Sequence, residues 1–97
     1  MQIDLDALEV TKNAAAERYE LPVGDDMAFL EYKERGHVAA LVHTEVPERL
    51  EGRGIGNRLV RGALDLARHE GLKIIPACAF VKAFIGRHPE YADIVQE

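Results

Sequence analysis

The stretch EGRGIGN, Glu51 to Asn57, decides the fold, because three glycines at alternate positions lead directly into a helical pattern. Glycine adopts positive φ values at no steric cost and lets backbone N–H groups approach a ligand closely. A helix start adds unpaired N–H donors and the positive end of the helix dipole. We therefore expect a strand–loop–helix junction suited to an anion, with Arg53 and Arg58 adding positive charge.

Two common nucleotide loops do not fit this stretch. No Lys-Ser or Lys-Thr pair follows the glycines, which excludes a Walker-type triphosphate loop. The dinucleotide pattern Gly-x-Gly-x-x-Gly fails at Asn57, and no strand ending in an acidic residue follows about 20 residues later. Taken alone, the glycines are also compatible with a flexible connection that binds nothing.

The residues after the loop predict a helix that lasts to about Glu70. Apolar residues recur there at spacings of three and four, and Gly71 is placed to end the helix in a left-handed conformation. A buried strand over residues 72–75 follows. The strand over residues 37–46, this helix and the strand over residues 72–75 are expected to form a parallel βαβ unit with a right-handed crossover.

The N-terminal half predicts an antiparallel meander. Strands are expected over residues 8–11, 17–23, 27–34 and 37–46, with a turn around Lys12 and Asn13. The run of apolar residues 38–42 suggests a central strand covered on both faces. The predicted fold class is α/β, with a mixed sheet in which the meander is followed by the βαβ unit.

A second, shorter helix is expected over residues 80–87. Its apolar residues Phe80, Val81, Phe84 and Ile85 are predicted to pack inward. Residues 88–91, His-Pro-Glu-Tyr, begin a final turn or short helix.

Composition limits the class of protein. Ninety-seven residues with 47% hydrophobic content suit a single domain over residues 1–97. A formal net charge of −5 disfavours general nucleic-acid binding. The single cysteine, Cys78, excludes a cysteine zinc cluster and favours a reducing compartment. No apolar run approaches the ~20 residues that span a bilayer, and the start resembles no export signal, so we expect no membrane partner and a cytoplasmic location.

Four motifs in this order resemble the minimal single-domain members of the GNAT N-acetyltransferase superfamily. They are HTEVP at 43–47, the glycine loop, IPACAFV at 75–81 and HPEY at 88–91. The resemblance covers essentially the whole chain, although Glu51 stands where the family has Gln or Arg. It implies an acetyl-CoA-dependent transfer to an amine acceptor, without a metal, on a GNAT-like fold that lacks the usual C-terminal strands.

The resemblance also implies where the coenzyme binds. Its pantetheine arm is expected between the strand before the loop and the strand after the helix, beside the backbone of Val46. Pro76 cannot donate a ladder hydrogen bond, which independently favours broken pairing there. The implied cofactor-binding residues are Val46, Arg53, Gly54, Ile55, Gly56, Asn57, Phe80, Phe84, Arg87 and His88. For Phe80 and Phe84 a purely structural role in the core is the alternative.

Three side chains are candidates for the chemistry. His43 and Glu45 share one face of the expected strand, where either is a candidate general base, with a purely structural histidine as the alternative. Cys78 precedes the second helix and is a candidate acyl acceptor, with a buried, inert thiol as the alternative. A coenzyme A or acyl-CoA binding module without catalysis, and an interaction domain that binds no anion, remain the competing functions.

Overall fold

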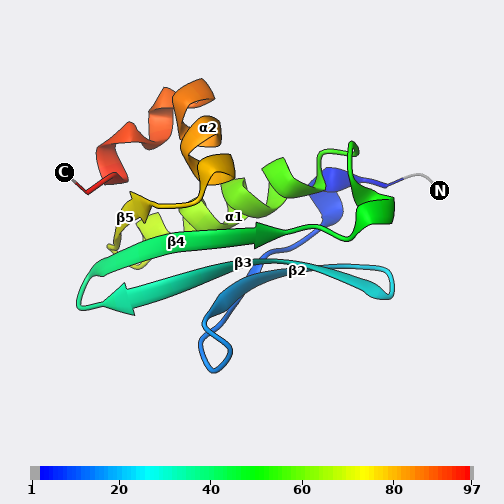
Figure 1. The fold of residues 1–97 in the computed structure, drawn as a ribbon, viewed down its shortest axis with the longest axis horizontal. Helices are drawn as coiled ribbons and strands as arrows, with labels where there is room; N and C mark the ends of the chain where they lie inside the picture. Colours follow the sequence, from blue (N-terminus) through cyan, green and yellow to red (C-terminus); the bar gives the residue numbers. More distant parts are fainter. Residues whose placement is uncertain (1–2, 97) are drawn as a thin grey trace.

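The computed structural model describes residues 3–96. Figure 1 shows its two α-helices lying on one side of a twisted sheet. The strands and helices, in chain order, are β1 (Thr11–Asn13), β2 (Arg18–Val23), β3 (Asp26–Arg35), β4 (Val38–Glu45), α1 (Ile55–His69), β5 (Lys73–Pro76) and α2 (Ala79–Arg87). Short 3-10 helices span Leu5–Ala7, Glu48–Leu50 and Pro89–Ile94.

The sheet has the predicted mixed topology. Its strand order is β1-β2-β3-β4-β5, with antiparallel pairing from β1 to β4 and parallel pairing between β4 and β5. The helix α1 connects the two parallel strands and ends at His69, followed by Gly71 with φ +75°. The α/β fold class, the meander and the βαβ unit are therefore confirmed.

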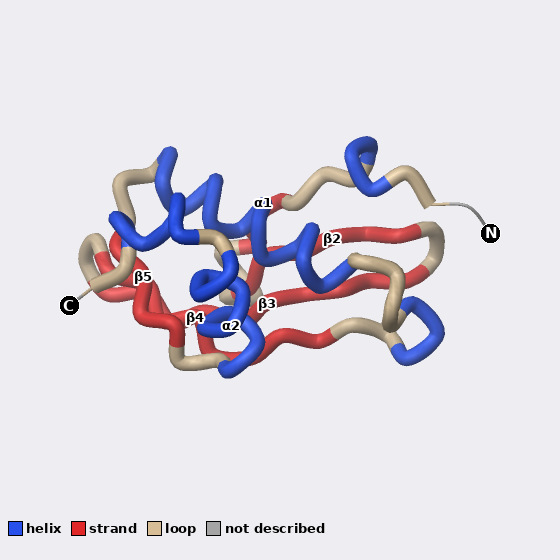
Figure 2. Tube along the Cα trace, turned by 90° about the horizontal axis from the view of Figure 1, so that it is seen from above, coloured by secondary structure: helices blue, strands red, loops and turns tan. Residues whose placement is uncertain are grey.

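Both α-helices lie over the same face of the sheet, as Figure 1 shows from the side and Figure 2 from above. We call this face the inner face and the opposite one the outer face. On β4, Ala39 and Leu41 are fully buried, whereas Val38 and Ala40 are half-buried and Val42 is 38% exposed. The expectation that residues 38–42 are covered on both faces is therefore wrong, because both α-helices lie on the inner face and leave Val42 exposed.

A β-bulge in β4 changes which side chains face the helices. Glu31 pairs with His43 and Tyr32 pairs with Leu41, so Val42 is an extra residue on β4. An extra residue shifts the alternation of side chains by one position. Leu41 faces inward before the bulge, and after it Thr44 does.

His43 and Glu45 face outward on the same strand. Thr44 pairs with the buried Leu30 on the inner face, whereas Glu45 pairs with Phe29 and His43 with Glu31 on the outer face. The bulge thus places one polar side chain under the helices and two on the open side of the sheet.

The first strand begins later than predicted. We expected it over residues 8–11 with a turn at Lys12 and Asn13, but Lys12 pairs with Tyr19 inside β1. The Lys12 ammonium bonds the carboxylates of Glu34 and Glu70 at 2.7 and 2.8 Å, which holds it in the ladder. The turn follows β1, where Asn13 Oδ1 accepts a hydrogen bond from the N–H of Ala16 at 3.1 Å.

Close packing holds α1 against the N-terminal segment. Gly62 lies in the middle of α1, and a Cβ atom built there would be 2.4 Å from Cγ2 of Val10. Val10 is itself buried, with 7% of its surface exposed. A side chain at position 62 would therefore separate α1 from the chain that leads into β1.

The C-terminal segment pairs with part of β5 along the edge that faces away from β4. Val95 forms an isolated parallel bridge with Ile74, and the N–H of Gln96 donates to the carbonyl of Ile74 at 2.8 Å. Apart from this bridge, no strand follows β5 within residues 3–96, as the resemblance implied. No helix in the same range is both long enough and apolar enough to cross a bilayer.

Candidate active site

The parallel strands β4 and β5 separate at the centre of the site. Their pairing ends where Leu41 lies opposite Pro76, and the N–H of Cys78 then donates to the carbonyl of Leu41 at 2.8 Å. Beyond this point β4 continues to Glu45, while the other chain turns into α2. The ladder stops at Pro76, and the predicted break in pairing is confirmed.

The glycine loop leads into α1 without a side-chain cap. Gly52 and Gly54 have φ values of +76° and +81°, the left-handed region that favours glycine. Gly54 is the N-cap of α1, and a glycine has no side chain with which to cap the helix. The N–H of Arg58 donates to the carbonyl of Gly54 at 3.0 Å, which begins the helical hydrogen bonding. The N–H groups of residues 55–57 are thus in the positions that bind anions at helix starts.

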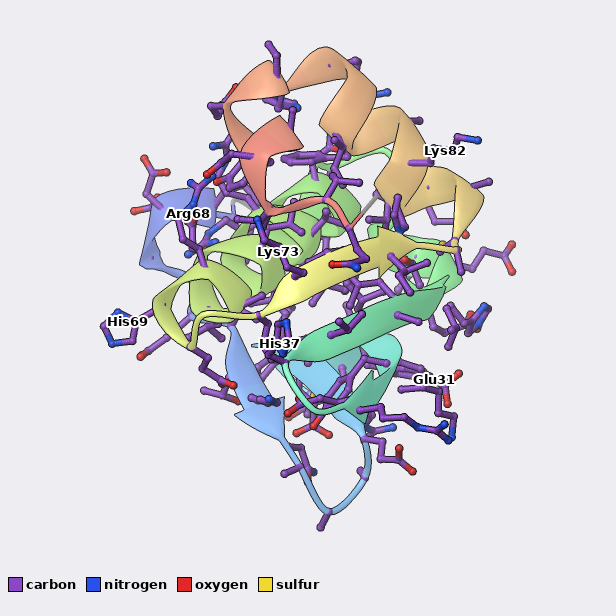
Figure 3. The ribbon with its side chains drawn as sticks, turned by 90° about the vertical axis from the view of Figure 1, so that its left-hand side faces the viewer. Glu31, His37, Arg68, His69, Lys73 and Lys82 are labelled. Carbon is purple, nitrogen blue, oxygen red and sulfur yellow. The ribbon has the colours of Figure 1, made fainter. Side chains whose placement is uncertain are left out.

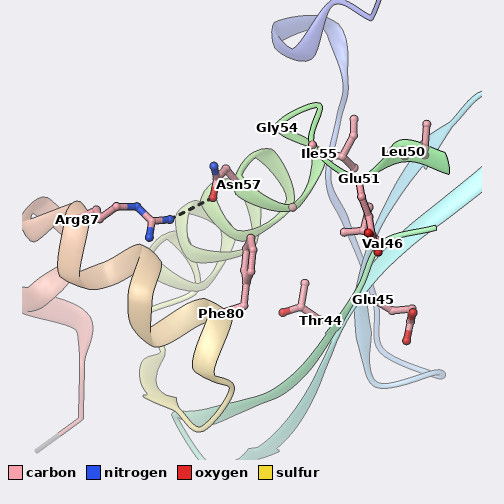
Figure 4. Close-up of a pocket in the computed structure, with 12 residues that line it drawn as sticks. Thr44, Glu45, Val46, Leu50, Glu51, Gly54, Ile55, Asn57, Phe80 and Arg87 are labelled. Carbon is pink, nitrogen blue, oxygen red and sulfur yellow. Dashed lines mark hydrogen bonds between the residues drawn. The ribbon is translucent and has the colours of Figure 1, made fainter. Parts of the chain in front are cut away.

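A cavity of about 480 Å³ joins this helix start to the gap between the strands. It lies on the inner face, and Figure 4 shows the residues that surround it. Thr44 points toward Phe80 across the cavity, while Glu45 points away from it. The lining residues are Thr44, Glu45, Val46, Leu50, Glu51, Gly52, Gly54, Ile55, Gly56, Asn57, Phe80 and Arg87.

Phe80 forms one wall of this cavity. A Cβ atom at Gly56 would lie 2.8 Å from Cζ of Phe80, so the ring occupies the space beside the bare backbone of α1. Phe80 is 41% exposed, which corrects the expectation that it packs into the core. The aromatic ring and the glycine together form a surface that a larger residue at position 56 would fill.

Phe84 and His88 lie away from this cavity. Phe84 is only 1% exposed and belongs to the core, the structural alternative considered above. His88 stacks on Phe84 with ring centroids 4.0 Å apart, and its Nδ1 lies 2.9 Å from the Phe84 carbonyl oxygen. Both residues line a second cavity of about 460 Å³, which shares Gly54 and Asn57 with the first.

The two arginines of the expected cofactor site differ in position. Arg87 lines the first cavity, and its guanidinium donates to Asn57 Oδ1 at 3.4 Å, linking α2 to the start of α1 (Figure 4). Arg53 is exposed and lines another cavity, formed with the β2–β3 turn and residues 49–50.

Cys78 is the N-cap of α2 and lies at the gap between the strands. Its Sγ is 3.4 Å from Oγ1 of Thr44, across the gap. Burial raises the pKa of the Cys78 thiol, but hydrogen bonds from the Thr44 hydroxyl and from the backbone N–H groups of Val81, Phe80 and Thr44 outweigh this effect. The pKa of Cys78 is therefore below its ordinary value, which favours the nucleophilic thiolate.

Replacing Thr44 with valine is expected to raise the pKa of the Cys78 thiol, because the variant keeps the shape but loses the hydroxyl donor. The measurement is the ultraviolet absorbance of the thiolate as a function of pH. Thr44→Ser retains a hydroxyl and is the matched control, expected to titrate close to the parent protein. If Thr44→Val and Thr44→Ser titrate alike, the side-chain hydroxyl does not stabilise the thiolate.

His43 and Glu45 form an exposed pair on the outer face. His43 Nε2 lies 2.9 Å from a carboxylate oxygen of Glu45, and both side chains are more than half exposed. The hydrogen bond to Glu45 raises the pKa of His43, with a smaller contribution from the charge of Glu31. The raised pKa means that His43 keeps its proton to higher pH than a histidine without this partner.

The family follows from comparison with known proteins. The profile described as GCN5-related N-acetyl-transferase matches residues 18–94. The chain belongs to this family. The NMR solution structure of a GCN5-like protein from Staphylococcus aureus superimposes on this fold with a TM-score of 0.69. The two chains are 25% identical, and the match covers 92% of this chain and 88% of the other.

Several animal proteins are also similar to this member of the GCN5-related family. Protein NATD1 from Bos taurus and from Homo sapiens is 37% identical over 65 residues, which is 66% of this chain. Protein NATD1 from Danio rerio is 37% identical over 71 residues. The matched segment spans 58% of the bovine and human proteins and 64% of the zebrafish protein, less than two thirds of their length.

Thr44 is the residue of this GCN5-related site that sequence reasoning missed. The sequence contains a signal for it, because Val46 is an expected coenzyme-binding residue and Thr44 stands two positions earlier on the same strand face. The side chains on either side of Thr44, His43 and Glu45, are more reactive and are the ones that a search for a base selects. Within residues 3–96, no group of three or more His, Cys, Asp or Glu side chains is arranged to hold a metal ion.

Proposed function

We propose that this protein is an acetyl-CoA-dependent N-acetyltransferase that transfers an acetyl group to an amine. The observation that carries the proposal is the cavity joining the uncapped start of α1 to the gap between β4 and β5. A helix start suits a pyrophosphate, and the gap suits an extended, uncharged arm. Membership of the GCN5-related family supports the same conclusion.

The residues around the cavity fit coenzyme A. Backbone N–H groups of Ile55, Gly56 and Asn57 would hold the pyrophosphate, and Arg87 lies close enough to add positive charge. A side chain at Gly56 would meet Phe80 at 2.8 Å, so the missing Cβ keeps this wall open. The backbone of Val46 and the ring of Phe80 would line the pantetheine arm. The coenzyme supplies the acetyl group as a thioester.

The outer-face pair supplies the base in this proposal. An amine acceptor is mostly protonated at neutral pH and must lose a proton to become a nucleophile. His43 is positioned to take that proton on the outer side of the gap, and the carboxylate of Glu45 stabilises the imidazolium that forms. Activity is therefore expected to require neutral His43.

The pH dependence of activity follows from this requirement. Because Glu45 raises the pKa of His43, the acid limb of kcat/KM is expected above the ordinary histidine value of about 6.5. Activity should rise as pH increases through the pKa of folded His43. In Glu45→Gln the limb should move to lower pH, since the charge that stabilises the imidazolium is gone. A limb that stays in place in Glu45→Gln would exclude His43 as the group that titrates.

Cys78 offers a covalent route. In this route its thiolate forms a bond to the thioester carbonyl carbon, and the coenzyme leaves as a thiolate. The amine nitrogen then attacks the same carbon, its proton passes to His43, and the Cys78 thiolate leaves. We expect Cys78→Ala to lose turnover by at least about tenfold with saturating acetyl-CoA, measured as acetyl transfer. Full turnover in Cys78→Ala would restrict the reaction to direct attack by the amine.

Two measurements together test the proposed function. Calorimetry with acetyl-CoA measures binding, and release of free coenzyme A in the presence of mixed primary amines measures transfer. Binding with amine-dependent release supports the transferase. Binding without release supports a coenzyme A or acyl-CoA binding module, and no binding at millimolar concentration overturns both.

A further inference from the structure

The outer face of the sheet adjoins the gap from the side opposite the cavity. Thr44 lines the cavity on the inner face, and its neighbours His43 and Glu45 project from the other side of the same strand. Because β4 and β5 are unpaired beyond Leu41 and Pro76, this is the place where the two faces meet. An acceptor that reaches His43 must therefore lie on the outer face.

The outer face near the gap combines apolar and acidic side chains. Ile75 on β5 is 43% exposed and Val42 on β4 is 38% exposed. The half-buried Phe29 lies on the same face next to His43, with the two ring centroids 6.4 Å apart. Large apolar side chains gathered on one exposed area are typical of surfaces that bind a partner.

The charges near the gap favour a cationic group. Glu31 and Glu45 are exposed on either side of His43, and Figure 3 shows Glu31 on the side of the sheet away from α1. Arg18 stands opposite Glu31 on β2, and its guanidinium is paired with Glu20 and lies 4.6 Å from the centroid of the Phe29 ring. Arg18 together with Glu20, Glu31 and Glu45 carries a net charge of −2. The local charge therefore complements an ammonium group.

This surface is open rather than enclosed. No helix in the described chain crosses the outer face, as Figures 1 and 2 show. Glu31, His43, Val42 and Ile75 stand on strands and line none of the four cavities formed around α1, the glycine loop and the β2–β3 turn. Small ligands usually bind in pockets that bury most of their surface, whereas proteins bind on flat surfaces of several hundred Å².

We propose that the acceptor is the side-chain amine of a lysine in a polypeptide that docks on the outer face. The acidic pair Glu31 and Glu45 attracts the ammonium to His43, and Val42, Ile75 and Phe29 contact apolar side chains that flank the lysine. The rest of the polypeptide supplies the contact area that the open sheet does not provide for a free amine. This proposal rests on the proposed acetyl transfer.

The docking step can be tested without acetyl transfer, by recording the backbone amide signals of the nitrogen-15-labelled protein. The probe is a nine-residue peptide with one central lysine between leucines. Butylamine, which reproduces the lysine side chain alone, and the same peptide with norleucine in place of lysine are the controls. We expect the lysine peptide to shift the signals of Phe29, Glu31 and Ile75 and butylamine at equal concentration to leave them unchanged.

Glu31→Gln is expected to weaken peptide binding about three- to fivefold, the usual range for one exposed ion pair. Glu9→Gln, an exposed glutamate that precedes the strand at the opposite edge of the sheet, should bind the peptide like the parent protein. Equal shifts with butylamine, shifts confined to another face, or no shifts with the lysine peptide would overturn the proposal, as would equal binding of the norleucine peptide.

A separate titration with acetyl-CoA distinguishes this inference from the proposed function. Signals of Gly54, Ile55 and Gly56 report coenzyme binding at the inner cavity, and those of Phe29 and Glu31 report the peptide. If the first group does not respond, the proposed function fails, whatever the peptide does. If the signals of Gly54, Ile55 and Gly56 respond but kcat/KM for the lysine peptide is no higher than for butylamine, the proposed acetyl transfer stands and the proposal of a polypeptide acceptor is wrong.

Discussion

Leucine in place of Gly56 is expected to reduce the affinity for coenzyme A at least about hundredfold, a loss of roughly 2.7 kcal/mol. A Cβ atom at this position already meets the Phe80 ring at 2.8 Å, and the larger side chain would fill the cavity beside the start of α1. The helix itself should tolerate the change, because leucine has a higher helix propensity than glycine. Calorimetry with coenzyme A measures the loss, and thermal unfolding confirms that the variant folds.

Gly86→Leu is the matched control for this experiment. Gly86 is also helical, in α2, but a Cβ atom there would have no neighbour within 4 Å, and the residue lines none of the described cavities. The Gly86→Leu variant should bind coenzyme A like the parent protein. Unchanged affinity in Gly56→Leu would mean that the coenzyme does not use this cavity.

Alanine in place of Gly62 is expected to destabilise the protein by about 2 kcal/mol. In an exposed helix the same change would stabilise by up to about 1 kcal/mol, because glycine loses more backbone entropy on folding. Here the new methyl group would lie 2.4 Å from Cγ2 and 2.6 Å from Cβ of Val10, a buried side chain with little room to move. Urea unfolding of the two proteins measures the difference in the free energy of unfolding.

Two further variants identify the cause. Gly86→Ala makes the same substitution where nothing lies within 4 Å, and we expect it to be neutral or slightly stabilising. Val10→Ala combined with Gly62→Ala should recover part of the lost stability, because it removes Cγ2, the nearer of the two clashing atoms. A Gly62→Ala protein as stable as the parent would show that α1 and the N-terminal segment can separate without cost.

The central part of the fold was predictable because its signals are local. Glycines at 52 and 54 adopt the positive φ values expected of a loop, and Gly71 follows the end of α1 with a positive φ. Each of these residues acts through its own backbone restrictions, which do not depend on distant contacts. The short edge strand β1 was misplaced because Lys12 is held there by Glu34 and Glu70, which are remote in sequence.

The site was harder to predict than the fold. Phe80 and Phe84 stand four residues apart on one helix and are indistinguishable in sequence, yet one lines the cavity and the other is fully buried. The difference arises because α2 begins at the gap, so its first turn borders open space while its second turn covers the core. Which turn of a helix faces a cavity depends on tertiary packing and cannot be predicted from the spacing of apolar residues in the sequence.

The extra residue in β4 has a consequence for comparing this chain with its relatives. Val42 reverses the parity of the strand, so that odd-numbered positions point toward the helices before it and even-numbered positions after it. A relative that kept every residue but paired regularly through this position would turn the counterparts of His43 and Glu45 toward the inner face and the counterpart of Thr44 toward the outer face. Two chains with the same residues in the HTEVP motif can therefore present its histidine on opposite faces of the sheet, and only the register of the strand before the motif distinguishes them.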